Sequence, residues 1–491
     1  MIGLPALAQL LIPYDSTLRD AMEVIESNAQ GLCFAVNGGV LVGVLSDGDI
    51  RRALMKGTQL DRSVYEVMQK NFISLKINTP LDQIQAHLNE NIRMIPIVDE
   101  LGELVDFACA YRYHQVPLTQ PVLDGNELEY VTECIHTGWI SSQGKFVQRF
   151  EELFGTYVGS PHALAVSNGT VALHLALVTL GIGPGDEVIV PDLTFAAPVN
   201  AVLYVGATPV LVDIDQHSMT MNMGAAERAV TARTRAIIPV HLYGHPVDMG
   251  QVLALAKKHD LAVVEDCAEA IGSLYQGVPV GNFGHAAIFS FYGNKTITTG
   301  EGGMLLFKDA AMYERARMLR DHGMSRDRRY WHDQVGFNYR MTNIQAAIGV
   351  AQMERIEKFV DRKRWNAHQY RLRLSNVAGL QLVSEAVDVV NSYWFYTILL
   401  PRELSAKRDE IIGMMLKNGV EARPVFYPMH RMPPYAPFVK TGQTYPISDA
   451  VSDAGISLPS GVNMSEADVE KVCFVLINII AQYRSNDLPL N

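Results

Sequence analysis

Apolar runs alternate with amphipathic stretches through most of the chain after residue 116. The pattern of a buried strand occurs at 187–191, 208–213, 236–241, 262–266 and 286–292, and helical spacing occurs at 223–230 and 249–259. Strands that alternate with helices in this way favour a mostly parallel sheet with helices on both faces. The sequence therefore predicts an α/β fold for this part of the chain.

The first 115 residues follow a different pattern, which occurs twice. An amphipathic helix that begins near Ser16 is followed by apolar runs at 32–36 and 41–45 around a Gly-Gly turn, as in a hairpin. The same plan returns at 79–82, 94–99 and 104–107. An internal duplication is therefore predicted for a domain of residues 1–115. The proline-containing segment 115–121 is the predicted joint to a second domain, residues 117–491.

Length and composition limit the possible classes of protein. At 491 residues the chain is too long for one ordinary domain. A formal charge of −11 argues against a nucleic-acid or anionic-membrane surface, and no long apolar window predicts a membrane span. The apolar N-terminal stretch lacks a basic leader, so we expect it to be folded protein. Five cysteines without Cys-x-x-Cys pairs predict reduced thiols, a cytoplasmic location and no metal site.

One lysine, Lys295, lies between an apolar run and a glycine-rich turn. The run at 286–292 has the pattern of a strand, so the Lys295 amine is expected at a strand end, beside backbone that can approach a ligand closely. Aromatic and hydroxyl residues rather than carboxylates flank it in sequence. Burial would lower the pKa of such an amine and free it to form a Schiff base with an aldehyde cofactor. A solvated loop lysine is the ordinary alternative.

An acidic residue, Asp266, ends the predicted strand at 262–266. The carboxyl ends of parallel strands face the crevice in which open α/β sheets bind ligands, so Asp266 is placed to pair with a cationic ring. Pyridoxal phosphate needs a lysine for its aldehyde and a carboxylate that keeps its ring nitrogen protonated. Lys295 and Asp266 together therefore predict this cofactor. Taken alone, Asp266 could instead cap a helix that begins at the next residues.

Two more positions could hold such a cofactor. Residues 163–174 predict a strand, a turn and a helix, with Ser-Asn-Gly-Thr at 167–170 in the turn. The free N–H groups of a helix start, with the Thr170 hydroxyl, suit a phosphate, although the same residues also merely cap helices. Phe195, just beyond the strand at 187–191, could lie flat on a cofactor ring or could be an ordinary core residue.

Four motifs, in this order, carry a family resemblance. They are Ser-Asn-Gly-Thr at 167–170, Glu-Asp-Cys-Ala-Glu-Ala at 265–270, Ser-Phe-Tyr-Gly-Asn-Lys at 290–295 and Gly-Glu-Gly-Gly at 300–303. From them the chain is identified as a member of the DegT/DnrJ/EryC1/StrS family of sugar aminotransferases, over roughly residues 117–485. The resemblance implies the fold type I architecture of pyridoxal phosphate-dependent enzymes. It comprises a large cofactor-binding part at about 117–365 and a small C-terminal α+β part at about 366–491.

The resemblance also implies a role for each matching residue. Lys295 would bond to the cofactor and move protons, Asp266 would hold the ring nitrogen, and Glu269 would lie near the ring hydroxyl. Phe195 would stack on the ring. The remaining cofactor-binding residues would be Gly169, Thr170, Ser290 and Asn338. In the family the equivalent of Asn338 comes from the neighbouring subunit, which implies a homodimer or a larger homo-oligomer.

Further motifs at 328–332, 335–345 and 423–435 are similar to one branch of this family. That branch aminates C4 of GDP-4-keto-6-deoxy-D-mannose with L-glutamate, for surface polysaccharides such as the O-antigen of lipopolysaccharide. Tyr330, Trp331 and His430 are then the candidates to bind the sugar nucleotide. Two alternatives stay open: a C4 or C3 aminotransferase for a UDP- or dTDP-linked keto sugar, and a nucleotide-sensing regulatory protein without catalytic activity.

The duplicated segment resembles a pair of CBS modules, a small α/β domain. Residues 43–52 are similar to the part of such modules that holds the ribose and phosphates of a nucleotide. On this resemblance Asp49 would bind the ribose hydroxyls, with Ser46 and Arg51 nearby. The second half, at 108–113, carries no Asp-Gly-Asp, so at most one intact nucleotide site is expected. Ligand sensing and a purely structural or oligomerising role both stay open.

Overall fold

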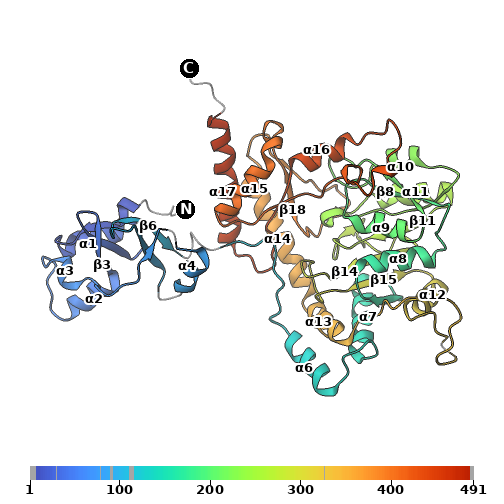
Figure 1. Ribbon diagram of the computed structural model, residues 1–491, viewed down its shortest axis with the longest axis horizontal. Coiled ribbons are helices and arrows are strands. Elements are labelled where there is room, and N and C mark those ends of the chain that lie inside the picture. Colours follow the sequence, from blue (N-terminus) through green and yellow to red (C-terminus); the bar gives the residue numbers. More distant parts are fainter. Residues whose placement is uncertain are drawn as a thin grey trace. The chain divides into compact units, whose positions relative to one another are not determined.

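The computed structural model describes residues 7–28, 30–77, 79–88, 92–109, 115–325 and 327–486. The chain divides into two compact units, residues 1–115 and 116–491 (Figure 1). The predicted duplication lies in the first unit, and the predicted α/β sheet lies in the second. Among the described helices, none combines the length and apolar character that crossing a membrane requires.

The first unit contains two small sheets and short helices. Its strands are β1 (Leu11–Pro13), β2 (Leu32–Asn37), β3 (Val40–Ser46), β4 (Leu75–Lys76), β5 (Met94–Val98) and β6 (Leu104–Cys109). Its α-helices are α1 (Leu18–Asn28), α2 (Asp47–Met55), α3 (Val64–Val67) and α4 (Leu81–His87).

The two sheets of the first unit repeat one plan. Their strand orders are β1-β2-β3 and β4-β5-β6. In each sheet the first pair is parallel and the second pair is an antiparallel hairpin. Phe34 of β2 and Phe107 of β6 share one buried cluster, which joins the halves. The predicted duplication is therefore confirmed. The prediction that the second half lacks an Asp-Gly-Asp motif concerned residues 108–113, and of these residues 110–113 lie outside the described part of the chain.

The second unit contains a large sheet, two smaller sheets and the longer helices. Its strands are β7 (Ala163–Val166), β8 (Glu187–Pro191), β9 (Thr208–Val212), β10 (Thr234–Ile237), β11 (Ala262–Asp266), β12 (Leu274–Tyr275), β13 (Val278–Pro279), β14 (Ala286–Ser290), β15 (Gly303–Phe307), β16 (Gln381–Leu382), β17 (Val389–Val390), β18 (Tyr396–Leu399), β19 (Arg423–Pro424) and β20 (Gly455–Leu458). Its α-helices are α6 (Glu127–Thr137), α7 (Lys145–Val158), α8 (Gly169–Thr179), α9 (Ala196–Tyr204), α10 (Met223–Ala229), α11 (Met249–His259), α12 (Ala310–Arg320), α13 (Asn343–Met353), α14 (Ile356–Leu374), α15 (Arg408–Lys417), α16 (Pro446–Ala454) and α17 (Glu466–Asn486).

The large sheet has seven strands in the order β7-β15-β14-β11-β10-β8-β9. The run from β14 to β9 is parallel throughout. β15 runs antiparallel to both of its neighbours, β14 and β7. The prediction of a mostly parallel sheet is thus confirmed. Because β15 is reversed, its first residue, Gly303, lies at the edge where β7 and β14 end.

Helices cover both faces of this sheet. On one face α8, α9 and α12 share a buried cluster with alternate strand residues such as Ile288 and Leu305. On the other face α7 and α13 pack on the intervening residues, among them Phe289 and Leu306. Strands buried on both faces need continuous apolar runs, which explains why β14 has no polar residue before Ser290. Figure 1 shows α8 lying against β14 and β15.

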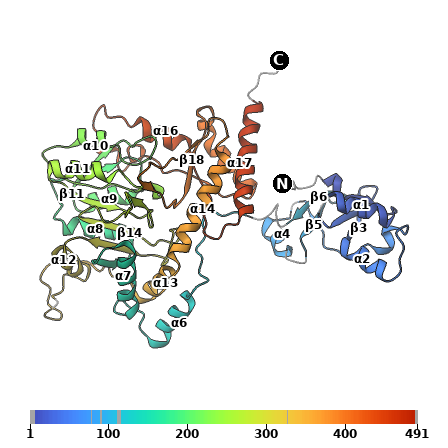
Figure 2. The same cartoon turned by 180° about the vertical axis from the view of Figure 1, so that it is seen from behind.

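A smaller antiparallel sheet of order β16-β18-β20-β19 follows in the C-terminal part. Its buried residues, including Tyr396 and Ile456, form one cluster with α14, α15 and α17. Figure 2 shows α14 leading from α13 to the side of α17. The division between large and small parts was predicted at 365/366, and this position falls inside the continuous helix α14.

Candidate active site

A cavity of about 640 Å³ opens where the parallel strands of the large sheet end. Its walls come from the segments that follow β7, β8, β10, β11 and β14, and from the C-terminal sheet. The residues on its walls that matter below are Gly169, Thr170, Phe195, Tyr243, Asp266, Glu269, Ser290, Lys295, Trp394, Arg423 and Phe426. This is the place at which open α/β sheets bind ligands.

Lys295 is buried in this cavity. Its side chain is 11% exposed, so the alternative of a solvated loop lysine is wrong. Nζ lies 3.4 Å from Glu269 Oε1 and 3.6 Å from the centroid of the Trp394 ring. Burial lowers the pKa of Lys295, although the charges of Glu269 and Asp266 oppose this shift. The lowered pKa was predicted, and Asp266 and Glu269 were predicted in the same site. The direct contact of Glu269 with Lys295 was not predicted, because the two residues are distant in sequence and the fold brings them together.

Asp266 ends β11 and faces the same cavity. Its side chain is 5% exposed, and its Oδ1 accepts a hydrogen bond from Ala268 N at 3.0 Å. No helix begins at this point of the described chain, so the carboxylate closes a short turn instead of capping a helix. Burial raises the pKa of Asp266, because a charged carboxylate is costly away from water; the hydrogen bond from Ala268 and the charge of Lys295 oppose this shift only in part.

Glu269 is held between a backbone donor and the lysine. Its Oε2 accepts from Tyr243 N at 2.8 Å, and its Oε1 faces Lys295. Burial raises the pKa of Glu269. Tyr243 adopts a left-handed φ of 54°, a conformation that costs a non-glycine residue of order 1–3 kcal/mol and often marks functional sites. In this strained conformation the Tyr243 N–H is directed toward the Glu269 carboxylate.

The first turn of α8 forms another wall. Asn168 caps the helix by accepting from Val171 N at 3.0 Å, which leaves the N–H groups of Gly169 and Thr170 free of helix partners. A Cβ on Gly169 would lie 3.1 Å from Ser290 Cβ, and a Cβ on Gly303 would lie 2.6 Å from Asn168 C. Only glycine allows this close approach. The arrangement leaves an anion site at the helix start, beside Ser290 at the end of β14.

Phe195 lies on the cavity wall and is not a core residue. It is 57% exposed and precedes α9, and its ring centroid is 5.8 Å from that of Phe426. The alternative of an ordinary core phenylalanine is therefore wrong.

Four predicted residues do not reach this cavity in their own chain. Asn338 is exposed, and its Oδ1 accepts from Arg340 Nε at 3.2 Å. Tyr330 and Trp331 are exposed on the same loop, at 75% and 50%. His430 is committed elsewhere, because its Nδ1 contacts Asp192 at 2.7 Å, its Nε2 contacts Asp449 at 3.3 Å and its ring stacks on Tyr445.

The candidate nucleotide residues of the first unit serve a helix cap. Ser46 and Asp49 form a reciprocal capping box at the start of α2. Asp49 Oδ1 also accepts from Arg52 at 2.6 Å and from Gln69 at 2.8 Å, so both carboxylate oxygens are occupied. Arg51 is exposed and pairs with Asp47. A ribose that bound Asp49 would have to replace hydrogen bonds within the domain.

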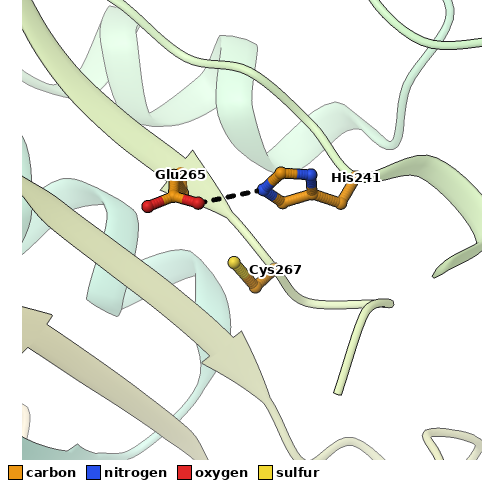
Figure 3. A group of neighbouring side chains, drawn as sticks. All are labelled: His241, Glu265 and Cys267. Atoms are coloured by element: carbon orange, nitrogen blue, oxygen red, sulfur yellow. Dashed lines mark hydrogen bonds and ion pairs between the residues drawn. The ribbon is translucent and has the colours of Figure 1, made fainter. Parts of the chain in front are cut away.

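Figure 3 shows a buried group beside the active site, His241, Glu265 and Cys267, whose potential ligand atoms all lie within 4.8 Å of one another. His241 Nδ1 accepts from Val247 N, so the ring proton is assigned to Nε2, which donates to Glu265 Oε2 at 3.2 Å. The Glu265 carboxylate also accepts from the backbone N–H groups of Gly281, Phe283 and Gly284. Burial raises the pKa of the Cys267 thiol, which disfavours the thiolate that binds metal. The His241 and Glu265 atoms already have partners within the protein, so we interpret this pair as a structural contact that joins the ends of β10 and β11.

Of the wall residues named above, four were not predicted as site residues: Tyr243, Trp394, Arg423 and Phe426. Tyr243, Trp394 and Phe426 stack with one another, at centroid distances of 6.1 Å and 5.3 Å from Tyr243. Arg423 and Lys295 are the basic side chains among the described residues of the cavity wall. The aromatic run at 393–396 was the one signal in the sequence that could have found Trp394.

A lysine, a buried acid and an anion site at the carboxyl ends of a mostly parallel sheet define a class, the pyridoxal phosphate-dependent aminotransferases. The model of the DegT/DnrJ/EryC1/StrS aminotransferase family matches residues 121–476, and the chain belongs to this family. The model of the CBS domain matches residues 10–56 and 64–107.

Relatives and solved structures agree with this assignment. Two proteins named GDP-perosamine synthase, from Caulobacter vibrioides and Escherichia coli O157:H7, are 46% and 47% identical to this chain. The matches cover 74% and 73% of this chain and 98% and 96% of the relatives. The PLP form of the putative sugar aminotransferase Spr1654 from Streptococcus pneumoniae has a TM-score of 0.72 at 27% identity, covering 75% of this chain and 99% of that one. The predicted enzyme class and cofactor are confirmed.

Proposed function

We propose that the enzyme transfers the amino group of L-glutamate to C4 of GDP-4-keto-6-deoxy-D-mannose, giving GDP-perosamine and 2-oxoglutarate for surface polysaccharide synthesis. The observation that carries this proposal is the buried Lys295, facing Glu269 and near Asp266, in a chain nearly half identical to two GDP-perosamine synthases. The reaction class follows from the lysine and the acids. The choice of nucleotide sugar follows from the likeness to these relatives.

The residues of the cavity fit pyridoxal phosphate. Asp266 is a buried acid with one hydrogen bond from the described residues, so it suits a protonated ring nitrogen. The helix start at Gly169 and Thr170, with Ser290 beside it, suits the phosphate. Gly303 lies against this helix start, and because it has no side chain it does not displace the backbone there. When bound, the cofactor supplies an aldehyde for the lysine and a ring that draws electrons from the reacting carbon.

Lys295 is the proposed proton carrier. Its lowered pKa favours the neutral amine, which can accept a proton at Nζ and return it. Glu269, fixed by Tyr243 N, would keep Nζ oriented and lie beside the ring hydroxyl. The Trp394 ring lies against Nζ, with its centroid 3.6 Å away, and would limit the access of water. Phe195 would cover the face of the cofactor ring.

Arg423 is the proposed anchor for the anionic substrates. Arg423 lies on the cavity wall, and its guanidinium donates to Glu421 Oε1 at 3.0 Å, while Glu421 Oε2 accepts from Leu118 N. Glutamate and a nucleotide diphosphate are both anions, and arginine binds carboxylates and phosphates through paired N–H groups. Asn338 stays a proposed contribution from a second subunit. We extend this proposal to Tyr330 and Trp331, the candidates for the sugar nucleotide, because neither lines the cavity of its own chain.

His430 has a different proposed part. Its backbone N–H and its ring Nδ1 both reach the Asp192 carboxylate, which lies just before Phe195 in the chain. We therefore propose that His430 fastens the Phe195 segment, and contact with the sugar nucleotide is a prediction that remains to be tested.

For the first unit we keep the proposal of a regulatory guanine nucleotide or GDP-sugar site at Ser46, Asp49 and Arg51. Calorimetry of the full chain with GDP, GTP, AMP and ATP tests it. Heat of binding that disappears in Asp49→Ala is expected, and no heat with any of these nucleotides would remove the proposal.

The enzyme assay is decisive for the main proposal. Purified protein is incubated with glutamate and, separately, with GDP-, UDP- and dTDP-linked 4-keto sugars, and products are identified by mass spectrometry. Amination of the GDP sugar and its loss in Lys295→Ala are the expected results. Preference for a UDP- or dTDP-linked sugar would show that the proposed GDP sugar is not the substrate. Undiminished turnover in Lys295→Ala would overturn the proposed mechanism.

A further inference from the structure

A second lysine, Lys363 of α14, is buried behind the active site. Its side chain is 1% exposed, and Nζ donates to the backbone oxygens of Trp394 at 2.9 Å and Ser460 at 2.7 Å. Within the described residues no carboxylate forms an ion pair with it. An amine in this setting is costly, because burial of a cation without an acid is unfavourable by several kcal/mol. Burial and, to a smaller extent, the charge of Lys295 lower the pKa of Lys363 to about 7.

The Trp394 carbonyl that Lys363 holds belongs to the residue that covers Lys295. The indole Nε1 donates to Asn294 O at 2.7 Å, and the ring centroid lies 3.6 Å from Lys295 Nζ. Trp394 is thus fixed at its backbone oxygen by Lys363 of α14 and at its indole nitrogen by Asn294, the residue before Lys295. A substitution of Lys363 would therefore affect the surroundings of Lys295 through Trp394.

Other side chains of α14 hold the same segment. Arg364 Nε donates to Asn391 O at 3.3 Å, and Arg371 donates to the Tyr393 hydroxyl at 2.7 Å. Tyr393 has a left-handed φ of 52°, an unfavourable conformation for tyrosine that persists only when the surroundings impose it. The chain just before Trp394 is therefore strained, and the Lys363 contact is what secures Trp394 itself.

We propose that Lys363 is a positioning residue for Lys295: its buried amine fixes Trp394 over the active-site lysine and so determines how readily that lysine gives up its proton. The inference deepens the proposed function, since it rests on Lys295 being the cofactor-bonding amine. The charged groups that face Lys295 from the described chain are Glu269 and Asp266, which favour its charged form. Trp394 acts in the opposite sense, because its ring helps to exclude water, and burial is the largest cause of the lowered pKa of Lys295.

The test measures Lys295 in the cofactor-free full chain. Labelling of Lys295 by an amine-reactive acylating reagent is followed by mass spectrometry from neutral to alkaline pH, and the midpoint of reactivity is compared between variants. Lys363→Met, which keeps the apolar stem, should move the midpoint upward by about one pH unit, because water that enters beside a loosened Trp394 favours protonated Lys295. In the holoenzyme the pH midpoint of the cofactor absorbance should move in the same direction.

Lys308→Met is the matched control. Lys308 Nζ also donates to a backbone oxygen, Phe283 O at 2.9 Å, but it is exposed, so its loss should leave the Lys295 midpoint unchanged. A folded Lys363→Met variant with the wild-type midpoint would overturn the proposal, even if its melting temperature fell, since a merely structural contact changes stability alone.

Trp394→Leu keeps the proposal testable if Lys363→Met does not fold. It removes the ring over Lys295 and should raise the same midpoint, and an unchanged midpoint would equally overturn the inference. These labelling results do not depend on the sugar nucleotide. A failure of the proposed substrate would therefore leave them standing, and a failure of the inference would leave the substrate assay unaffected.

Discussion

At the scale of single residues, Asp266 shows how one oxygen atom can decide the chemistry. Asp266→Asn keeps the shape of the side chain and the acceptor for Ala268 N, but it removes the negative charge. Removing one partner of a buried charge pair costs about 2–5 kcal/mol, so the glutamate half-reaction should slow by about thirtyfold or more. Stopped-flow absorbance of the bound cofactor measures this rate.

Asp260→Asn is the control for that variant. Asp260 is exposed just before the same strand and has a left-handed φ of 55°, which asparagine adopts readily. It should react at the wild-type rate. A fast half-reaction in Asp266→Asn would mean that another group holds the ring nitrogen.

Arg423 gives a second residue-scale prediction, which concerns binding instead of chemistry. Arg423→Gln should raise the KM for glutamate and for the sugar nucleotide by about tenfold or more, because a hydrogen bond to a charged group contributes about 1.5–3 kcal/mol. Steady-state kinetics test this, with the cofactor absorbance unchanged. The control is Arg235→Gln: Arg235 is exposed and donates to the backbone oxygen of Ala232, so its loss should leave both KM values unchanged. Equal KM values in Arg423→Gln would show that the guanidinium only pairs with Glu421.

At the scale of elements, β15 and α8 meet at Gly303. Gly303→Ala would place a methyl group 2.6 Å from the Asn168 carbonyl, so the turn before α8 must move and the phosphate site with it. We expect at least tenfold weaker binding of pyridoxal phosphate, measured by fluorescence titration of the apoenzyme. Gly413→Ala in α15, where nothing lies within 4 Å of the added Cβ, should bind the cofactor normally and be slightly more stable. Normal affinity of Gly303→Ala for the cofactor would show that the phosphate does not bind at the start of α8.

Elements and their local motifs were predictable because their signals are local. The burial of β14 follows from its apolar run, and Lys295 follows it in sequence, so its place at the sheet edge needed no tertiary knowledge. The Asn168 cap and the start of α8 are equally local.

The rest of the site depends on contacts between distant segments. Trp394 reaches Lys295 only because α14 and the C-terminal sheet pack behind it, and no periodicity in the sequence reports that. His430 was assigned to the substrate on resemblance alone, whereas its ring pairs with Asp192 and Asp449. Asp49 likewise matches a nucleotide motif, yet its oxygens are used by the capping box, Arg52 and Gln69.

At the scale of the whole molecule, the question is what the first unit adds. About three quarters of this chain aligns with nearly the whole length of each of the two GDP-perosamine synthases. A chain of residues 116–491 should therefore keep the cofactor absorbance and the glutamate half-reaction within about threefold of the full chain. The cut must precede Val116, which pairs with Val420 in the second unit. An inactive but folded fragment would show that the first unit takes part in catalysis.

The reversed strand β15 determines when the active site can first exist. β7 has its neighbour in the sheet only after β15 has been synthesised, because the strand beside it comes from a distant part of the chain. The contact of Gly303 with Asn168 and Gly169 therefore forms only after β15 has been made, and so does the complete phosphate site. Long sequence separations of this kind slow folding. Vitamin B6 supplied to the growing cell should thus rescue poorly folding variants only at a late, post-translational stage, after both partners of that contact have emerged.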